Sequence, residues 1–297
     1  MAATTTVQVP HLGGINVGYR ISGGSLDSSK PTAVLINSMC TTSSLYNVQF
    51  EDRALTEAVN LLAIEPLGHG ATSAKSDQWT YWDTAIMALQ VMDALHVERA
   101  FALGTSQGGW IVVRMALLAP DRILGLLPLA TSMDCESAAS REKGCWDPQT
   151  QLAPFYDSFC SSTPTPDYVV DEVWRGMVCQ LGFSASTPKE TQSFWDETLK
   201  TVYRGDEGRR KLRMALACLL ERDGLLFRLR DIKCPVHWLQ GTEDPVFGTV
   251  LPKDHIKLFT AATEATLTMV EGGCHYLSAT NPKEVNEALL SMVKKYT

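Results

Sequence analysis

The chain has 297 residues, of which 45% are hydrophobic and 20% are charged, with 21 glycines and 14 prolines. This composition is that of an ordinary globular protein and excludes disordered, collagen-like and coiled-coil chains. There are 26 basic and 33 acidic side chains, a net charge of −7, and the absence of a long basic run argues against nucleic acid as a partner.

The length suits one or two domains. No apolar run approaches the roughly 18 residues of a membrane helix, and residues 1–14 lack the basic flank and apolar stretch of a secretion signal. We therefore expect a cytoplasmic protein that does not engage a membrane. The eight cysteines are scattered, without a C-x-x-C pair, which predicts buried or idle thiols for most of them and no structural metal site; a Cys135–Cys145 bridge is left open.

Short β-branched, apolar runs that end in Gly, Asn or Pro clusters predict strands. In chain order these runs are Ile15–Ile21, Thr32–Ile36, Leu61–Ile64, Ala100–Leu103, Ile123–Leu129, Val236–Leu239 and Ala265–Val270. Apolar residues at three- and four-residue spacing predict a helix over Trp82–Leu95. Near the carboxyl terminus, Asn281 as a cap, Pro282 at the first helical position and Glu284 reaching back predict the start of a last helix.

Strands that alternate with helices predict an α/β fold of three layers, in which helices cover both faces of a mostly parallel sheet. Ligands of such sheets bind at the carboxyl ends of the strands. Over residues 133–226 the strand pattern gives way to helical stretches that contain many aromatic residues. We predict a core of residues 1–132 and 227–297 with an inserted helical cap of residues 133–226. The cap aromatics either form its own core or line a pocket.

A G-x-S-x-G pattern, Gly104 to Gly108, joins the strand at Ala100–Leu103 directly to a helical pattern. A sharp strand-to-helix turn forces its central residue into a strained backbone conformation, which only very small neighbours allow. Ser106 is therefore predicted to project from the turn as a nucleophile. The backbone N–H of Gln107, at the start of the helix, is predicted to face a developing oxyanion.

A serine nucleophile needs a base, and the base needs an orienting group. His275 follows the last predicted strand and Asp244 follows Val236–Leu239, which gives the order Ser, Asp, His of the elbow motif. Asp134, which follows Ile123–Leu129, and Glu243 remain alternative acids. We expect Cys40 and Cys274 near the site as packing residues rather than nucleophiles. The remaining histidines are expected to be structural: His11, His69, His96, His237 and His255.

Together with the elbow, three segments make the whole chain resemble the α/β-hydrolase superfamily, in particular its enol-lactonase and esterase branch with a helical cap. Val34–Met39 resembles the oxyanion loop after the third strand, and its Asn37-Ser38 pair is similar to that of enol-lactone hydrolases. Glu65–Ser73 resembles the D-x-x-G-x-G-x-S turn, with Glu65 in place of Asp, and His275–Pro282 resembles the catalytic-histidine segment. The resemblance implies Met39 as the second oxyanion donor. Ser38 remains an alternative donor, a substrate contact or a purely local loop residue.

These residues predict a serine hydrolase that works through an acyl-enzyme and needs no cofactor. Trp174 and Met177 of the cap are predicted to contact the substrate, a largely apolar small molecule with an ester, lactone or thioester group. A cluster of basic residues either binds an anionic group or forms a solvated helix face: Arg209, Arg210, Lys211 and Arg213.

Fold and triad leave other functions open. They are acyl transfer, carbon–carbon bond hydrolysis or cofactor-free peroxide chemistry on the same triad, and a slow-turnover receptor for a small ligand. A homodimer is also left open.

Overall fold

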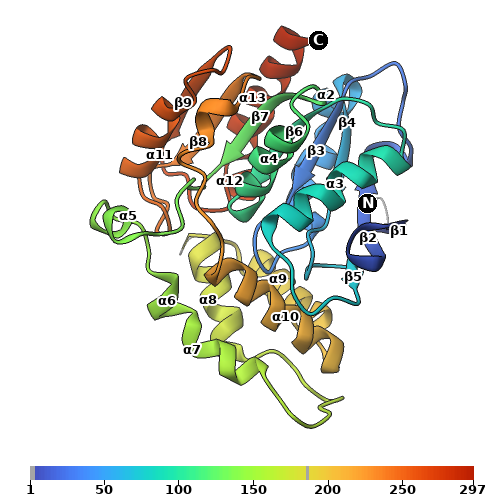
Figure 1. Ribbon diagram of the computed structural model, residues 1–297, viewed down its shortest axis with the longest axis vertical. Helices are drawn as coiled ribbons and strands as arrows, with labels where there is room; N and C mark the ends of the chain where they lie inside the picture. The colour runs from blue at the N-terminus through green and yellow to red at the C-terminus, as the bar shows by residue number, and fades with distance from the viewer. Residues whose placement is uncertain (1–3, 185–186) are drawn as a thin grey trace.

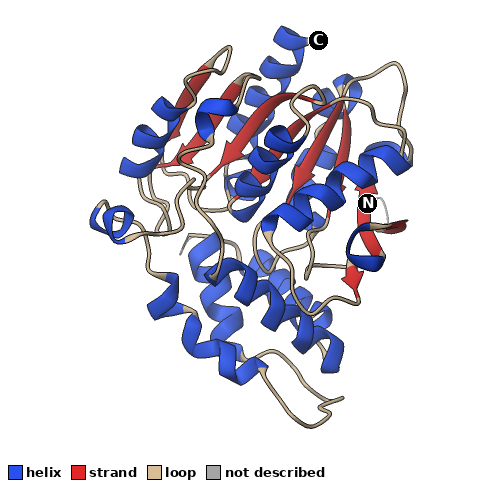
Figure 2. Cartoon of the chain, viewed as in Figure 1, coloured by secondary structure: helices blue, strands red, loops and turns tan. Residues whose placement is uncertain are grey.

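The computed structural model describes residues 4–184 and 187–297. A single sheet with the strand order β1-β2-β4-β3-β6-β7-β8-β9 forms the centre of the molecule, and β5 pairs with β2 (Figures 1 and 2). The strands are β1 (Thr5–Val9), β2 (Ile15–Ile21), β3 (Thr32–Ile36), β4 (Asn60–Ile64), β5 (Ser73–Ala74), β6 (Ala100–Thr105), β7 (Ile123–Leu129), β8 (Val236–Gly241) and β9 (Ala265–Val270). Along the sheet from β4 to β9, every pair of neighbouring strands is parallel. Strand β2 instead pairs in antiparallel fashion with each of its neighbours, β1, β4 and β5. The predicted mostly parallel sheet is confirmed.

The runs predicted as strands all form strands, with shifts of no more than two residues at their ends. The sequence analysis did not predict β1 and β5. In β1, Val9 is the one fully buried residue, because the strand lies at the edge of the sheet and pairs only with β2. Its polar, threonine-rich sequence therefore lacks the apolar run that marks the inner strands.

Helices cover both faces of the sheet because side chains alternate in direction along each strand. In β3, Val34 and Ile36 point into one core, which α3 (Tyr81–Ala94) and α4 (Gln107–Leu118) complete. Ala33 and Leu35 point into the other core. That face is covered by α1 (Asn47–Glu51), α2 (Arg53–Ala58), α12 (Leu277–Thr280) and α13 (Pro282–Tyr296). These two helical layers around the sheet confirm the three-layer α/β fold.

Helices α3 and α13 begin with different local hydrogen bonds. Helix α3 begins with a capping box, in which Asp83 Oδ2 accepts from Thr80 N–H at 2.7 Å and Thr80 Oγ1 accepts from Asp83 N–H. Helix α13 begins at Pro282 as predicted and Asn281 occupies the N-cap position, but its side chain makes no capping hydrogen bond. The Asn281 side chain instead accepts from the neighbouring Thr280 hydroxyl at 2.8 Å, so it does not reach the N–H groups of the first turn.

Between β7 and β8 the chain forms a helical layer, most of which lies beyond the carboxyl ends of the strands (Figure 1). Its helices are α5 (Ala138–Glu142), α6 (Pro148–Gln151), α7 (Ala153–Tyr156), α8 (Glu172–Gly182), α9 (Lys189–Val202) and α10 (Gly205–Leu220), all inside the predicted cap range; α11 (Val250–His255) follows β8. The layer has its own core, in which Phe155 and Phe159 contact Trp174 edge-on at centroid distances of 5.1 and 5.0 Å.

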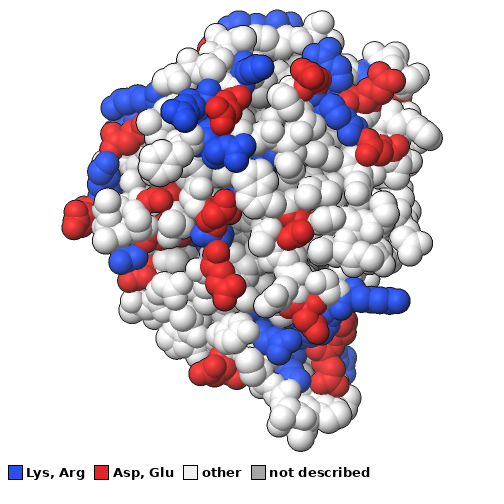
Figure 3. Space-filling view, viewed as in Figure 1, with Lys and Arg blue, Asp and Glu red and all other residues white. Residues whose placement is uncertain are grey.

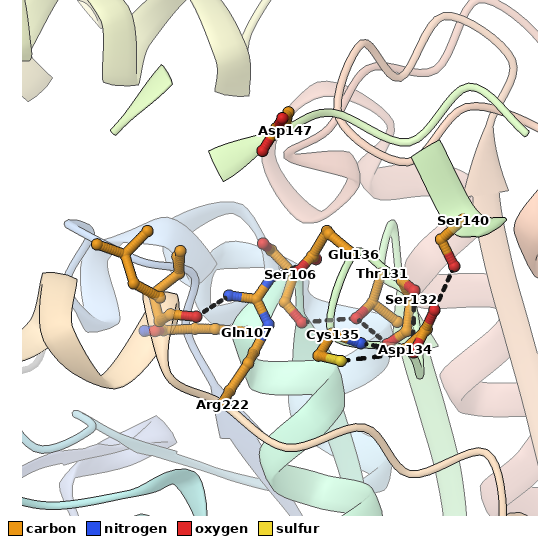
Figure 4. Close-up of polar contacts among 12 residues, drawn as sticks. Ser106, Gln107, Thr131, Ser132, Asp134, Cys135, Glu136, Ser140, Asp147 and Arg222 are labelled. Atoms are coloured by element: carbon orange, nitrogen blue, oxygen red, sulfur yellow. Dashed lines mark hydrogen bonds and ion pairs between the residues drawn. The ribbon is translucent and has the colours of Figure 1, made fainter. Parts of the chain in front are cut away.

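The two segments that connect this layer to the sheet lie side by side. Leu225 N–H donates to Met133 O at 2.7 Å. A buried ion pair links Glu136 in the first segment to Arg222 in the second, and the Arg222 guanidinium lies 4.8 Å from the ring centre of Trp110 in α4 (Figure 4). Both connections are thereby fixed to the helix that follows Ser106.

On the face of the molecule in Figure 3, basic and acidic side chains are interspersed rather than separated by sign. None of the helices in the described part of the chain is both long and apolar enough to span a bilayer. All eight cysteines are free thiols, as predicted for most of them, and Cys135 and Cys145 form no bridge.

Candidate active site

Ser106 occupies a sharp turn between β6, which ends at Thr105, and α4, which begins at Gln107. Its backbone has φ 54° and ψ −118°, a conformation that is strained for a residue with a side chain. Ser106 N–H donates to Leu129 O at 2.9 Å, and the Thr131 hydroxyl donates to Ser106 O at 2.9 Å (Figure 4). The neighbouring strand β7 and the residues after it therefore hold the turn in place.

Two glycines of the motif are required by close backbone contacts. A Cβ on Gly104 would lie 2.1 Å from the Gly108 carbonyl, and a Cβ on Gly108 would lie 1.9 Å from the Ile36 carbonyl oxygen. Real Cβ atoms do not come so close to backbone atoms. Glycine at these positions therefore lets α4 start directly against β3, which brings Ser106 next to the loop after β3.

Asp244 and His275 lie on two loops that brace each other beyond β8 and β9. Glu243 N–H donates to Gly273 O at 2.9 Å, and Gly272 N–H donates to the Thr242 hydroxyl at 2.9 Å. His275 Nδ1 lies 3.1 Å from Asp244 Oδ1 and 3.2 Å from Oδ2. The predicted acid and base are thus brought into hydrogen-bond contact.

The Asp244 carboxyl group is fully buried, and burial alone would raise its pKa. The charge and hydrogen bond of His275 outweigh burial, together with Val246 N–H at 2.8 Å and Gln240 Nε2 at 2.7 Å, so the pKa lies below its ordinary value. A carboxylate only accepts hydrogen bonds, so Nδ1 of His275 carries a proton. In the neutral ring Nε2 is then an acceptor, which is the form that a general base needs.

The alternative acids are placed elsewhere. The Asp134 carboxylate accepts from the Ser140 hydroxyl and from Cys135 N–H at 2.9 Å (Figure 4). It also accepts from the Ser137 hydroxyl at 2.5 Å. These hydrogen bonds hold the Asp134 side chain at the start of α5. Glu243 is exposed. Of the three candidate acids, Asp244 is the one in contact with His275.

The loop after β3 and the start of α4 form a second wall beside Ser106. The Asn37 side-chain amide donates to Thr41 O at 2.9 Å and to Ser38 O at 3.1 Å, which fixes the turn that contains Met39. Ser38 is buried and its hydroxyl interacts with Tyr276. Ser38 therefore has a partner within the protein in addition to its place at the cavity described next.

Ser106 and His275 line one small cavity of about 50 Å³. The three residues predicted to contact substrate, Ser38, Trp174 and Met177, line it as well, as does Met39. The sequence analysis did not predict the rest of the lining: Trp146, Leu152, Val178, Leu181, Leu219, Val246 and Tyr276. The apolar residues 174, 177, 178 and 181 repeat at helical spacing on α8, a signal in the sequence that points to one shared face.

Several larger grooves lie elsewhere on the described part of the chain. One of about 780 Å³ lies between α8 and α9, and one of about 650 Å³ lies between α10 and residues 76–83. Neither is lined by Ser106 or His275. Because the small cavity holds the reactive groups, we assign the candidate site to it rather than to the larger grooves.

The remaining candidates have structural surroundings. Burial raises the pKa of the Cys40 thiol to about 12 and that of Cys274 above its ordinary value, so neither is a ready thiolate. Arg210 donates to Ala74 O at 2.6 Å and Lys211 donates to Gly70 O at 3.3 Å. These two basic side chains attach α10 to the core and do not line the cavity. Among the described residues, no group of three or more His, Cys, Asp or Glu side chains is arranged to hold a metal ion.

Comparisons with known proteins agree with this architecture. Residues 33–157 match the sequence model of the family described as alpha/beta hydrolase fold. A curated relative, the dihydrolipoyllysine-residue acetyltransferase component of the acetoin cleaving system of Cupriavidus necator, is 28% identical over 124 residues. That match covers 42% of this chain and 32% of the relative, so this chain corresponds to about a third of that protein.

Solved structures of similar fold cover nearly the full chain. A hydrolase from Pseudomonas aeruginosa has a TM-score of 0.73 and 23% identity, with 97% of this chain and 98% of that chain covered. The enol-lactonase from Burkholderia xenovorans has a TM-score of 0.76 and 18% identity, with coverage of 97% and 100%. A bromoperoxidase from Bacillus anthracis has a TM-score of 0.78 and 17% identity, with coverage of 98% and 100%. The family match and these solved structures show that this chain has the alpha/beta hydrolase fold, in keeping with its strand order and with the strained serine between β6 and α4.

Proposed function

We propose that this protein is a serine hydrolase that cleaves a carboxylic ester, lactone or thioester of a small, largely apolar molecule. The observation that carries the proposal is the meeting of Ser106, on its strained turn, with the Asp244–His275 pair at one apolar cavity. A nucleophile, a base and an orienting carboxylate are the groups that acyl transfer to water requires. Esterases and an enol-lactonase are among the proteins of similar fold, which is in keeping with this chemistry.

In the proposed reaction, His275 Nε2 takes the proton of Ser106 as Oγ attacks the acyl carbonyl carbon. The carbonyl oxygen becomes an oxyanion, which the backbone N–H groups of Gln107 and Met39 stabilise. The oxyanion then re-forms the carbonyl group and expels the leaving group, which receives the proton from the imidazolium. Water, activated by the same imidazole, attacks the acyl-enzyme and releases the acid, while Asp244 stabilises the imidazolium in both steps.

The cavity favours a compact, uncharged acyl group. Pockets for drug-sized ligands measure about 300 to 1,000 Å³, several times more than the cavity beside Ser106. None of the described residues that line it is Lys, Arg, Asp or Glu, so an anionic acyl chain would find no counter-charge from them. Short-chain esters and small lactones are therefore the first substrates to test.

Acyl transfer to an acceptor other than water is the second candidate. The same apolar lining limits access of water to the acyl-enzyme, which favours a competing acceptor. The curated relative from Cupriavidus necator is named as an acetyltransferase component. Transfer predicts that added alcohols or thiols divert the acyl group, so that ester or thioester product forms at the expense of acid.

The test combines intact-mass analysis after treatment with a fluorophosphonate and hydrolysis of p-nitrophenyl acetate. We expect one label per chain, located at Ser106, and measurable turnover. Ser106→Ala should lose both, whereas Ser29→Ala, at an exposed loop serine far from the cavity, should keep both. A folded parent chain that is neither labelled nor active would contradict the hydrolase, and saturable ligand binding without turnover would then favour the receptor.

A further inference from the structure

His69 is buried close to the candidate site, yet the reaction described above does not use it. We propose that His69 is a positioning residue of the oxyanion hole, which fixes the side chain of Gln107 and thereby the backbone N–H that stabilises the oxyanion. The inference rests on the proposed hydrolase function. It concerns a histidine that the sequence analysis assigned to a structural turn.

The turn that carries His69 is rigidly held. It follows β4, and the carboxylate of Glu65 accepts from Ala71 N–H at 2.7 Å across the turn and from Ser43 N–H at 3.0 Å beyond it. The Thr72 hydroxyl donates to Glu65 O at 2.6 Å. His69 therefore extends from a braced backbone toward the start of α4.

The hydrogen bonds around His69 determine where each proton lies. Nδ1 lies 2.8 Å from Leu67 O, and because a carbonyl oxygen only accepts, Nδ1 carries the ring proton. Nε2 is then an acceptor. It lies 3.0 Å from Nε2 of Gln107, whose amide group must donate. Burial, assisted by the positive charge of Lys211, lowers the pKa of His69 to about 4, so this neutral form is the one present at neutral pH.

Gln107 uses the rest of its side chain to join two further elements. Its amide group also lies 3.4 Å from Asn37 O, on the loop that leads to Met39. Its Oε1 accepts from the Tyr81 hydroxyl at 3.3 Å, at the start of α3. Both proposed oxyanion donors, Gln107 and Met39, are therefore tied to one network in which His69 supplies the shortest contact to Gln107.

Fixing these donors matters because an oxyanion hole works through groups that need no rearrangement during the reaction. Loss of one donor typically lowers kcat about 100-fold to 1,000-fold. Loss of the contact that positions a donor should lower kcat by a smaller factor. We expect about a tenfold decrease in kcat, with KM changed by less than about twofold, because the loss falls on the transition state.

Two substitutions at position 69 separate the two ring nitrogens. In His69→Asn, the side-chain amide can still donate to Leu67 O from the position of Nδ1, but nothing accepts from Gln107. In His69→Gln, the longer side chain can place its oxygen near the position of Nε2 and accept from Gln107. We expect the tenfold loss of kcat in His69→Asn and recovery to within about threefold of the parent in His69→Gln.

The affinity for an inhibitor is a measurement that a general loss of folding stability does not change. A trifluoromethyl ketone forms a tetrahedral adduct with a serine hydrolase and places an oxyanion in the hole, so its affinity should fall in proportion to kcat/KM across the variants. As a control, Asn60→Ala removes the hydrogen bonds of a buried side chain to Asp27 O and Lys30 O near the start of β4. It should lower the melting temperature and leave kcat and inhibitor affinity unchanged.

Gln107→Met removes the partner of His69 but keeps the backbone N–H. We expect it to lose kcat to the same extent as His69→Asn, and the double variant to lose little more. If His69→Asn does not fold, Gln107→Met carries the test.

Parental kcat and inhibitor affinity in folded His69→Asn or Gln107→Met would overturn the positioning role, as would equal losses in His69→Asn and His69→Gln. A parent chain without turnover or labelling overturns the proposed function instead.

Discussion

At the residue scale, the environment of Asp244 shows how a buried carboxylate is held next to His275. Its carboxylate is buried, but it accepts from His275, Val246 N–H and Gln240, so its charge is fully compensated. Asp134 also has several partners, which lie on the segment before α5 and in α5 itself. Which of the two acids contacts His275 is thus decided by the loop that carries it, not by its own hydrogen bonds.

Replacing Asp244 by Asn should decrease kcat by about 10³-fold to 10⁴-fold, because the neutral amide no longer stabilises the imidazolium or selects the tautomer with Nδ1 protonated. Stopped-flow or steady-state hydrolysis of p-nitrophenyl acetate measures the loss, and the rate of fluorophosphonate labelling should fall with it. Glu243→Gln, at the exposed neighbour, is the matched control and should retain parental rates. A loss of this size in Asp134→Asn rather than Asp244→Asn would assign the acid to Asp134.

Motifs in the sequence predicted Ser106 and His275, which line the cavity, and Asp244, which contacts His275, because strand ends and glycine-rich turns fix their backbone. They did not predict the residues that hold the site residues in place. Gln240 is four residues before Asp244 on a strand that reads as a plain apolar run, and Tyr81, His69 and Gln107 come from three separate elements. Such contacts depend on how separate elements pack together, so the spacing of residues within one segment does not predict them.

At the scale of elements, the sharp turn at Ser106 depends on how closely α4 approaches β3. Gly108 is the point of contact, because its Cα faces the Ile36 carbonyl. The turn thus stores backbone strain at Ser106, and the packing of α4 against the sheet maintains it.

Gly108→Ala should destabilise the fold by about 3 kcal/mol or more and abolish turnover, because the added methyl group would lie 1.9 Å from the Ile36 carbonyl oxygen and force α4 away from β3. Chemical unfolding and p-nitrophenyl acetate hydrolysis measure the two effects. The same substitution at Gly176, inside α8 with nothing within 4 Å of its added methyl group, should stabilise the fold by about 0.5 to 1 kcal/mol. Equal effects of the two substitutions would contradict the packing argument.

The inner strands were predictable, whereas of the two edge strands β9 was predicted and β1 was not. The inner strands are continuous apolar runs because both faces meet helices. Strand β1 is stabilised mainly by its pairing with β2, and its sequence therefore resembles a loop. The start of α13 was predicted at the correct residue because Pro282 fits the first turn, but the side-chain partner of Asn281 was set by its neighbour Thr280.

At the scale of the whole molecule, two buried histidines make stability depend on pH. Burial lowers the pKa of His69 and of His255 to about 4, while an unfolded histidine titrates near 6.5. Between these values the unfolded chain binds more protons than the folded chain, so folding stability falls as pH decreases from about 6.5 to about 4. Above about pH 6.5 these two groups contribute no slope.

We expect each histidine to contribute a slope of up to about 1.4 kcal/mol per pH unit within this window. Guanidinium unfolding at pH 7.0, 6.0 and 5.0 measures the total slope. In His255→Asn, the amide oxygen can still accept from Met133 N–H, and the slope should fall by up to about 1.4 kcal/mol per pH unit, which corresponds to one proton. His96→Asn, at an exposed position, should leave the slope unchanged. A slope unaffected by His255→Asn would show that His255 is protonated in the folded protein.

The hydrogen bond between Leu225 and Met133 has a consequence for how such a molecule can diversify. It makes the helical insertion a loop whose two ends coincide, so its length and sequence can change without moving β7 or β8. Ser106, Asp244 and His275 all lie outside residues 133–226, whereas much of the wall that faces them, including Trp174 and Met177, lies inside. In the proposed function, reactivity and selectivity reside in separate stretches of the chain, so grafting a different insertion onto this core should change which molecule is bound while Ser106, Asp244 and His275 stay in place.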